Sequence, residues 1–471
     1  MAMSAEERQQ MLLTQPVEKI IPKMALPTIC SMLITSIYNM ADTYFVSQIG
    51  TAEASASGTS ASAAVGIVFS VMAMIQALAF MFGMGSGTNV SHLLGMGKRK
   101  EAEVYSAVGF FSAVAAGVLI AVLGNVFNEP LMRLLGATET AMPYALDYAR
   151  YIFLAAPFMM GSLSMNNLLR FQGLATYGMV GIISGGLLNM LLDPLLIFVC
   201  HFGMAGAAIA TVAGQALTAG LSIWYLTRMK QIHLQKDSFR PRAHLLGKCA
   251  KLGMTSFLAQ ISLVAAMAAT NTMLRICSAQ DAVFSQEEFS AIPMAVFGIV
   301  MKVFQIVISC AIGLAAGCIP VAGYNMGARR HDRVKGLLTR LLAAEAVVGL
   351  IALLVVELLP DQVMLLFGAQ NESIHYTLFA RRCFRVYLSM IVLACINKGT
   401  FIFLQSLGKA AASTLLSMAR EIVFGVGLVL LLPQFFQLDG VMYSMPAADV
   451  LTAILSAVVL VRTYRSLGME K

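Results

Sequence analysis

The sequence predicts an all-α integral membrane protein with twelve transmembrane helices in two six-helix bundles. Three observations lead to this fold class: a shortage of charge, long apolar stretches, and a loose repeat of the first half in the second. Of the 471 residues, 58% are hydrophobic and 12% are charged, whereas a soluble globular protein carries about 25% charged residues. The ranges 54–97, 171–192 and 194–227 contain no Asp, Glu, Lys or Arg. We therefore expect the lipid bilayer to surround the chain.

Twelve apolar segments are long enough to cross a bilayer, which takes about 20 residues in a helix. The ninth segment, 337–359, is the least typical because Glu345 and Glu357 fall inside it. The predicted spans are 20–49, 57–86, 104–126, 149–168, 176–200, 203–227, 250–274, 290–316, 337–359, 384–407, 411–433 and 440–463.

The basic residues gather on one side of this predicted membrane protein. The formal net charge is +8, yet alternate assignment of the loops puts 23 Lys and Arg on one side and six on the other. The remaining three, Lys302, Lys398 and Arg420, lie inside spans. Basic loops accumulate on the cytoplasmic side, so we expect a multi-pass protein of the inner (plasma) membrane with both termini cytoplasmic. The charge is thus a topology signal, and no nucleic-acid partner is expected.

The sequence offers no catalytic or metal-binding pattern. The histidines are isolated, with no HExxH pair, and no GxxxxGK[ST] phosphate loop occurs. The eight cysteines form no CxxC pair and are expected to act as small apolar residues. We therefore predict neither an enzyme nor a resident cofactor. Residues 1–15 are polar, with Glu6 and Glu7, and do not resemble a cleaved signal peptide.

The second half of the sequence loosely repeats the first. Segment 168–173 resembles 403–408, and four residues recur 230 positions apart at the end of a long apolar span. An even number of spans per repeat gives two parallel copies related by a pseudo-two-fold axis along the membrane normal, with a cavity between them. We therefore predict two lobes, 1–235 and 236–471, and a transporter. The recurring residues are Gly83, Gly87, Met96 and Gly97, then Gly313, Gly317, Met326 and Gly327.

Asp42 and Asp193 are the two clear ionisable residues within first-half spans. Such residues are costly in a bilayer and indicate function. Polar residues at helical spacing accompany them on three helices, and such stripes should face one another or a wet cavity. The stripes are Ser31, Thr35, Tyr38, Asn39 and Asp42 on the first helix; Asn189 and Asp193 on the fifth; and Thr211, Gln215, Thr218 and Ser222 on the sixth.

Asp42, Asp193 and Thr211 lie at similar depth, about seven or eight residues from the outer helix ends, or roughly 10–12 Å at 1.5 Å per residue. The two acids could then share one site. Two neighbouring carboxylates cannot both ionise cheaply in a low-dielectric environment, which suits proton binding. Neighbouring Asn and Thr oxygens would also suit a sodium ion. The alternatives are a helix-end role for Asp193, which precedes Pro194, and a structural pairing of Asp42.

Pro27 in the first span and Lys398 in the tenth are also unusual within membrane helices. Pro27 removes a backbone hydrogen bond from the first span and predicts a kink, either static or acting as a hinge. Lys398 is deep in the tenth span, where it should snorkel or pair with an acidic neighbour.

Five segments resemble the multidrug and toxic compound extrusion (MATE) transporters, most closely their DinF-like and MepA-like bacterial branch. The likeness covers almost the whole chain. The segments are Asn39-Met-Ala-Asp-Thr-Tyr-Phe-Val, Gly95-Met-Gly, Asn189-Met-Leu-Leu-Asp-Pro-Leu-Leu-Ile-Phe, Gly203-Met-Ala-Gly-Ala-Ala-Ile-Ala-Thr, and Gly313-Leu-Ala-Ala-Gly with Gly323-Tyr-Asn-Met-Gly-Ala.

This resemblance implies export of lipophilic, often cationic drugs or toxic metabolites in exchange for protons or sodium ions, by a protein that we expect to be a monomer. It assigns the cation site to Asp42 and Asp193, with Asn189 and Thr211 as polar partners. Tyr148 and Asn166 match by position but lie five turns, roughly 27 Å, apart on one helix. The seventh and tenth spans offer Gln260 and Lys398 where NorM-like members use acids. We expect the substrate cavity to include Tyr38, Asn39, Gln215 and Gln260.

Three rival functions are consistent with parts of the sequence. A flippase for lipid-linked sugars, from the same superfamily, needs a strongly cationic central cavity, which Lys302 and Lys398 would supply only in part. A major-facilitator carrier has the same number of helices, but the loop 95–103 lacks the expected Asp-Arg. A membrane-embedded enzyme needs a clustered catalytic set, and the sequence shows none.

Overall fold

The computed structural model describes residues 5–52, 57–135, 137, 139, 141–228, 243–286, 289–290, 292–366 and 374–469. Within these ranges, eleven helices are long and apolar enough to cross a membrane, and one helix pair bent by 44° forms a twelfth span. All twelve predicted spans overlap these segments, including the ninth with its two acids. The predicted all-α, twelve-helix fold class is confirmed.

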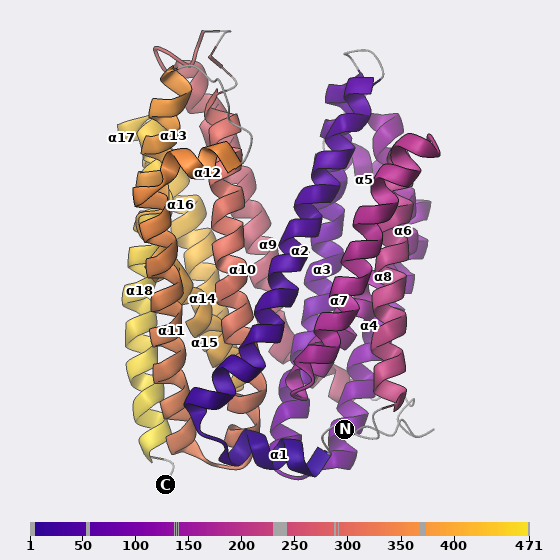
Figure 1. Ribbon diagram of the computed structural model, residues 1–471, viewed down its shortest axis with the longest axis vertical. Helices are drawn as coiled ribbons and strands as arrows, with labels where there is room; N and C mark the ends of the chain where they lie inside the picture. The colour runs from indigo at the N-terminus through magenta and orange to yellow at the C-terminus, as the bar shows by residue number, and fades with distance from the viewer. Residues whose placement is uncertain are drawn as a thin grey trace.

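The first half forms one group of helices, on the right in Figure 1. A short helix lies across the end where both termini are found, and six long helices follow. The elements are α1 (Ala5–Thr14), α2 (Val17–Ala52), α3 (Ser57–Gly95), α4 (Arg99–Val126), α5 (Asn128–Leu134), α6 (Met142–Phe171), α7 (Ala175–Pro194) with the π-helix η1 (Leu195–Val199), and α8 (Gly203–Arg228).

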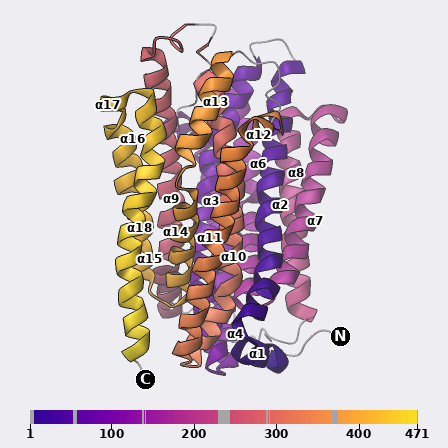
Figure 2. The same cartoon turned by 60° about the vertical axis from the view of Figure 1, so that its left-hand side comes forward.

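The second half forms the other group, which Figure 2 brings forward. Its tenth span is the bent pair α13 and α14, and its eleventh passes through a π-helix, η3. The elements are α9 (Ala243–Gln280), α10 (Ile292–Gly327), α11 (His331–Leu358), α12 (Pro360–Leu366), α13 (Ile374–Tyr387), α14 (Ile391–Ser406), α15 (Ala410–Met418), η3 (Ala419–Val426), α16 (Gly427–Leu431), α17 (Pro433–Phe436) and α18 (Leu438–Met469).

Helix α3 continues nine residues past the predicted end of its span at residue 86, as far as Gly95. The reason is that its polar residues do not interrupt the helix. Ser86, Thr88 and Asn89 each donate to the backbone carbonyl four residues earlier, at 2.6, 2.9 and 3.0 Å. Ser and Thr side chains satisfied in this way can remain inside a membrane helix.

The turns that end α3 and α10 have the same backbone hydrogen bonds, 232 positions apart. Met96, Gly97 and Lys98 bond back to His92, Leu94 and Leu93 just as Ala328, Arg329 and Arg330 bond to Tyr324, Met326 and Asn325. Gly97 therefore corresponds to Arg329, and both have positive φ, 77° and 57°. The predicted offset of 230 residues between the halves is wrong by two at this turn. Identical Gly and Met residues recur at an offset of 230, but the backbone hydrogen bonds of the two turns match at an offset of 232. The likeness of 168–173 to 403–408 is confirmed, since Gly173 and Gly408 end their helices with φ of 76° and 77°.

The two halves meet through pairs of contacts that obey the same pseudo-symmetry. A Cβ on Gly85 of α3 would lie 2.0 Å from the carbonyl oxygen of Cys249 on α9, and one on Gly317 of α10 would lie 2.3 Å from Cα of Ala25 on α2. Gly253 and Gly313 make the next contact along each pair. Because these glycines have no side chain, the helix backbones touch. The predicted lobe boundary between residues 235 and 236 lies outside the described residues.

These contacts lie toward the end where both termini are found. In Figure 1 the two groups of helices converge at this end and diverge at the other. His92 Nε2 hydrogen-bonds the carbonyl of Ser406 at 2.7 Å, which joins α3 to α14. Helix α1 is attached to the second half, because Asn325 donates to the carbonyl of Leu12 and Arg333 to that of Gln15. The terminal end is thus closed by contacts between the halves.

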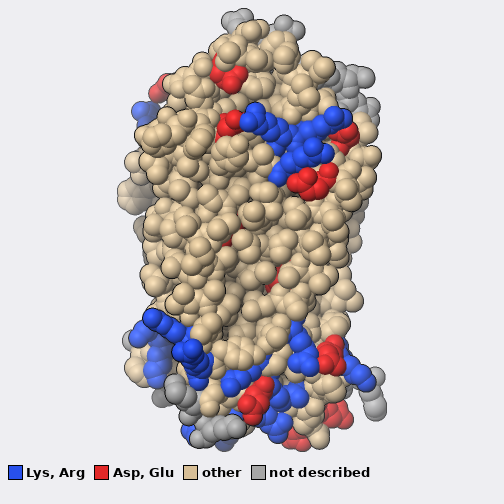
Figure 3. Space-filling model, turned by 90° about the vertical axis from the view of Figure 1, so that its left-hand side faces the viewer, with Lys and Arg blue, Asp and Glu red and all other residues tan. Residues whose placement is uncertain are grey.

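Charged groups gather at both ends of the face drawn in Figure 3, and the broad band between them shows only two small spots of acidic atoms. This is the distribution expected for a chain that crosses a bilayer. At the end opposite the termini, Asp361 accepts two hydrogen bonds from Arg381, at 2.7 and 2.6 Å. Those hydrogen bonds hold the pKa of the Asp361 carboxyl below its ordinary value.

Candidate functional site

Asp193 is fully buried at the end of α7, where the helix passes into η1. Asn189 lies one turn earlier on the same face, as a spacing of four residues requires. Its Nδ2 is 3.4 Å from Asp193 Oδ1 and 3.4 Å from Thr211 Oγ1 of α8. The structure therefore brings together three of the predicted residues from two helices.

Asp42 approaches the same site from α2. It lies within electrostatic range of Asp193, and Tyr148 of α6 lies within range of both carboxylates. Tyr148 itself is almost fully buried. Residues from α2, α6, α7 and α8 are thus gathered in the first half.

The site has a surplus of hydrogen-bond acceptors. Asp42 Oδ1, Asp193 Oδ2, Asn189 Oδ1 and Asn166 Oδ1 are buried oxygens with no hydrogen-bond partner in the described part of the chain. Buried polar atoms are nearly always paired, so the three unpaired oxygens of Asp42, Asp193 and Asn189 need an explanation. Asn166 Oδ1 lies apart from them, beside Gly178 near the start of α7. A proton or a metal cation would satisfy the three oxygens, whereas a second acceptor would not.

A polar pocket adjoins these residues, between α2, α6, α7 and α8. Asn166 lines it and donates to the carbonyl of Ser162 at 2.8 Å, so it faces the pocket from the opposite end of α6 to Tyr148. Ser162 in turn donates to Gln215 Oε1 at 2.6 Å. The other polar lining residues are Thr35, Tyr38, Asn189, Thr211 and Thr218.

The remaining predicted residues are less closely gathered. Tyr38 and Gln215 line the polar pocket together. Asn39 is exposed on α2 and is not among the residues lining that pocket. Gln260 belongs to α9, in the other half, so the structure does not bring it to the first-half site. Pro27 lies within α2, where its carbonyl accepts a hydrogen bond from Ser31 Oγ at 2.8 Å.

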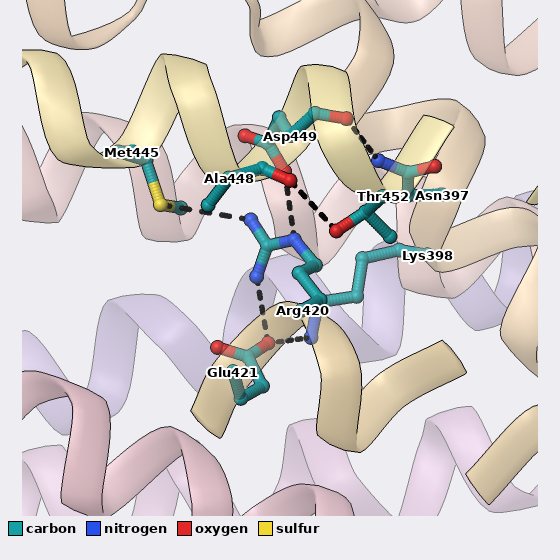
Figure 4. Close-up of polar contacts among 8 residues, drawn as sticks. All are labelled: Asn397, Lys398, Arg420, Glu421, Met445, Ala448, Asp449 and Thr452. Atoms are coloured by element: carbon teal, nitrogen blue, oxygen red, sulfur yellow. Dashed lines mark hydrogen bonds and ion pairs between the residues drawn. The ribbon is translucent and has the colours of Figure 1, made fainter. Parts of the chain in front are cut away.

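A second polar cluster lies in the other half, where sequence reasoning could not place its members (Figure 4). Lys398 of α14 donates to Glu421 Oε1 at 2.8 Å, which confirms the predicted pairing of this lysine with an acid. Arg420 donates to Glu421 Oε1 at 2.6 Å and to Asp449 Oδ1 of α18 at 2.7 Å. Two cations and two anions therefore balance. The sequence signal that could have indicated this cluster is the equal number of acidic and basic residues deep within the last three spans.

The repeat shows that the two halves carry different chemistry at matching places. Ala25 of α2 and Cys249 of α9 make equivalent contacts with the other half, so α9 corresponds to α2 at an offset of 224 residues. At this offset Ala266 occupies the position that corresponds to Asp42. Gly206 of α8 and Gly440 of α18 each contact the end of the preceding span, so α18 corresponds to α8 at an offset of 234 residues. At this offset Met445 occupies the position that corresponds to Thr211. The second half therefore lacks the counterpart of the acceptor-rich site.

One more acid lies inside a span. Glu345 of α11 is fully buried, and neither of its carboxyl oxygens has a hydrogen-bond partner among the described residues. It packs against Gly399 and lies within electrostatic range of Cys310 and Cys395. These neighbours supply no oxygen ligands, which separates Glu345 from the first-half site.

Comparison with known proteins agrees with this architecture. The MatE family model matches residues 27–195 and 266–431, one segment in each half. The multidrug export protein MepA of Staphylococcus haemolyticus (strain JCSC1435) is 23% identical over 457 residues, covering 96% of this chain and 95% of that protein. A crystal structure of MATE in complex with MaL6 superposes with a TM-score of 0.88 at 23% identity, covering 98% of this chain and 99% of that one.

A second solved structure, an outward-facing conformation of a multidrug resistance MATE transporter of the MOP superfamily, gives a TM-score of 0.87 at 24% identity over 98% of both chains. The family match covers more than half of this sequence and includes both Asp42 and Asp193. The chain belongs to the MATE family, whose members are membrane transporters and not enzymes.

Proposed function

We propose that this chain is a secondary active antiporter that exports lipophilic or cationic compounds in exchange for protons or sodium ions, with Asp42 and Asp193 as the coupling site. The observation that carries the proposal is the group of unpaired buried acceptor oxygens around these two acids. A coupling ion that binds there in one state and leaves in another shifts the balance between states by its difference in affinity.

The two halves, 1–235 and 236–471, act as the lobes of this cycle, and the terminal side is cytoplasmic. Support comes from the inter-half contacts, which gather toward the terminal end, and from the basic loops on that side. The described state then opens outward. Pro27 lies in α2, the helix that carries Asp42 and contacts α10 of the other lobe. It therefore acts as the hinge by which occupancy of the site changes the contact between lobes.

The rival flippase is less favoured by the charges. Lys398 and Arg420 are both paired with acids, so they do not make the central cavity strongly cationic. Lys302 is exposed on α10. Lipid-linked sugars carry phosphates, and a charge-balanced lobe lacks the net positive charge that would attract such a headgroup over a long range.

The test is transport in proteoliposomes under separately imposed proton and sodium gradients, with a lipophilic cation such as tetraphenylphosphonium as cargo. Asp42→Asn and Asp193→Asn each remove one charge at nearly constant shape and should abolish gradient-driven transport. The control is Glu129→Gln, an exposed acid paired with Arg133 outside the spans. Full gradient-driven transport by the Asp42→Asn/Asp193→Asn double variant would refute the proposed coupling site.

A further inference from the structure

In the second half an apolar pocket meets the charged cluster of Figure 4. The pocket lies between α9, α10, η3 and α18, and its apolar walls include Phe297, Met301 and Phe304. Arg420 and Glu421 supply its charged groups, with Met445 beside them, and its other polar lining residues are Thr270, Asn271, Tyr387 and Ser444. An apolar space with a few convergent polar groups has the form of a small-molecule site. Its volume in this state is about 50 Å³, so it must widen to admit the body of a ligand.

The nitrogen donors of Arg420 differ in the quality of their hydrogen-bond partners. Nε donates to Asp449 Oδ1 at 2.7 Å, and Nη1 donates to Glu421 Oε1 at 2.6 Å. Nη2 has only the Met445 sulfur as a partner in the described ranges, at 3.7 Å. A thioether is a weak acceptor, whereas a guanidinium bonds most strongly to the oxygens of a carboxylate. This nitrogen therefore has a poor partner in a place where a ligand oxygen would be a better one.

One carboxyl oxygen of each acid in the cluster is already engaged. Glu421 Oε1 accepts from both Lys398 and Arg420, and Asp449 Oδ1 accepts from Arg420. Lys398 has three N–H donors, and one of them is used in this cluster. The cluster has no net charge, but some N–H donors of Lys398 and Arg420 have no oxygen acceptor within it. An entering acceptor group can bond the spare donors of Arg420 and Lys398 without displacing an existing strong hydrogen bond, whereas a cation at Glu421 Oε1 or Asp449 Oδ1 would compete with these two residues.

We propose that this pocket binds amphipathic molecules that end in a carboxylate, with a ligand oxygen replacing Met445 sulfur on Arg420 Nη2. The apolar body of the ligand then lies against Phe297, Met301 and Phe304. This inference rests on the proposed export function and adds to it a substrate class and a second-half site. It agrees with the repeat: Met445 stands where Thr211 completes the acceptor-rich site of the first half, so the two lobes divide ion binding and cargo binding between them.

The experiment compares equilibrium binding of pyrenebutyrate and its methyl ester by full-length protein in lipid nanodiscs, with binding to empty nanodiscs subtracted. A hydrogen bond between charged groups predicts that the acid binds about tenfold or more tightly than the ester. Met445→Glu supplies an internal carboxylate for Nη2 and should abolish this preference. Met445→Gln, which adds no charge, should reduce it and serves if the glutamate variant does not fold.

Met445→Leu removes the competing sulfur at similar volume and should increase the preference for the acid. Ile454→Gln, an exposed position farther along α18, is the matched control for a new polar side chain on this helix and should leave the preference unchanged. Equal affinity for acid and ester in the unmodified protein would overturn the inference, as would an undiminished preference in both Met445→Glu and Met445→Gln. Because no gradient is imposed, such a failure together with intact gradient-driven cation transport removes only this inference and leaves the proposed function standing.

Discussion

At the scale of single residues, the proposed coupling site is distinguished by buried polar atoms that have no partner among the described residues. Asn189 is informative because its amide nitrogen lies between Asp193 and Thr211 while its amide oxygen has no partner in the described structure. In the proposed coupling site, the same side chain would orient a carboxylate and offer an oxygen to an ion. In the second half, by contrast, the buried charges of the Arg420 cluster neutralise one another.

Asn189→Ala should weaken binding of the coupling ion. The substitution removes one oxygen ligand and the amide that orients Asp193, and hydrogen bonds to charged groups are worth about 1.5–3 kcal/mol, which corresponds to roughly tenfold or more in affinity. The measurement is the ion concentration that gives half-maximal transport. The control is Leu191→Ala, which truncates an exposed side chain on the same helix. An unchanged half-maximal concentration in Asn189→Ala would remove this residue from the site.

Glu345→Gln should be tolerated. A fully buried carboxyl without a hydrogen-bond partner is costly to hold as a charge, and Gln has nearly the same shape as the neutral acid. We expect the free energy of unfolding to change by less than about 1 kcal/mol, whereas Glu345→Ala leaves a cavity and should cost roughly 2 kcal/mol or more. Thermal unfolding of the purified variants measures both. Loss of gradient-driven transport in a stable Glu345→Gln protein would show that the second half also couples to the ion.

At the scale of secondary-structure elements, the contacts between lobes are made by helix backbones. Helix α3 touches α9 at Gly85 and Gly253, and α10 touches α2 at Gly313 and Gly317. Side chains are excluded from these crossings, so a single added methyl group is felt there. The bend between α13 and α14 and the π-helix η3 both lie in the second lobe. The π-helix holds Arg420 and Glu421, in keeping with the frequent occurrence of π-helical turns at functional sites.

Gly253→Ala should push α9 away from α3, because its Cβ would lie 1.8 Å from the carbonyl oxygen of Met81. We expect a loss of about 1–3 kcal/mol, as for other overpacked contacts, together with a wider separation of the lobes at the terminal end. Spin-label distances between α3 and α9 and thermal unfolding measure the two effects. Gly247→Ala on the same helix meets nothing within 4 Å and should be neutral or slightly stabilising. Equal behaviour of the two variants would mean that the crossing is not tight.

At the scale of the whole molecule, orientation in the membrane decides the direction of transport. Both termini lie at the end where the lobes converge (Figure 1), and the basic loops predict that this end is cytoplasmic. Cys200 provides a natural probe, because it is exposed just after η1, whereas the other seven cysteines are buried or partly buried.

A membrane-impermeant maleimide should label Cys200 in intact cells. Labelling from outside requires that the connection between α7 and α8 is external, which holds if both termini are cytoplasmic. Mass spectrometry of the purified protein measures the modified residue, and Cys200→Ser is the control for labelling elsewhere. Modification of Cys200 only after the cells are permeabilised would reverse the proposed orientation.

Much of this fold was accessible from local sequence. The twelve spans, the side on which basic residues gather and the helix faces of Asp42, Asn189 and Asp193 all follow from hydropathy, charge and helical periodicity. They could be predicted because backbone groups in a bilayer must be satisfied within each helix, so every span is specified almost independently of the others.

Only the tertiary structure decided which residues meet. It paired Lys398 and Arg420 with Glu421, joined Arg420 to Asp449, and left the oxygens around Asp193 without partners among the described residues. It also set the offset between the two halves of the repeat at the ends of α3 and α10. There, identical residues in the sequence had indicated an offset that was two residues shorter. Such features depend on contacts between helices far apart in the sequence. A helix in lipid is as apolar toward its neighbours as toward the bilayer, so close packing and buried polar contacts, rather than hydropathy, choose its partners.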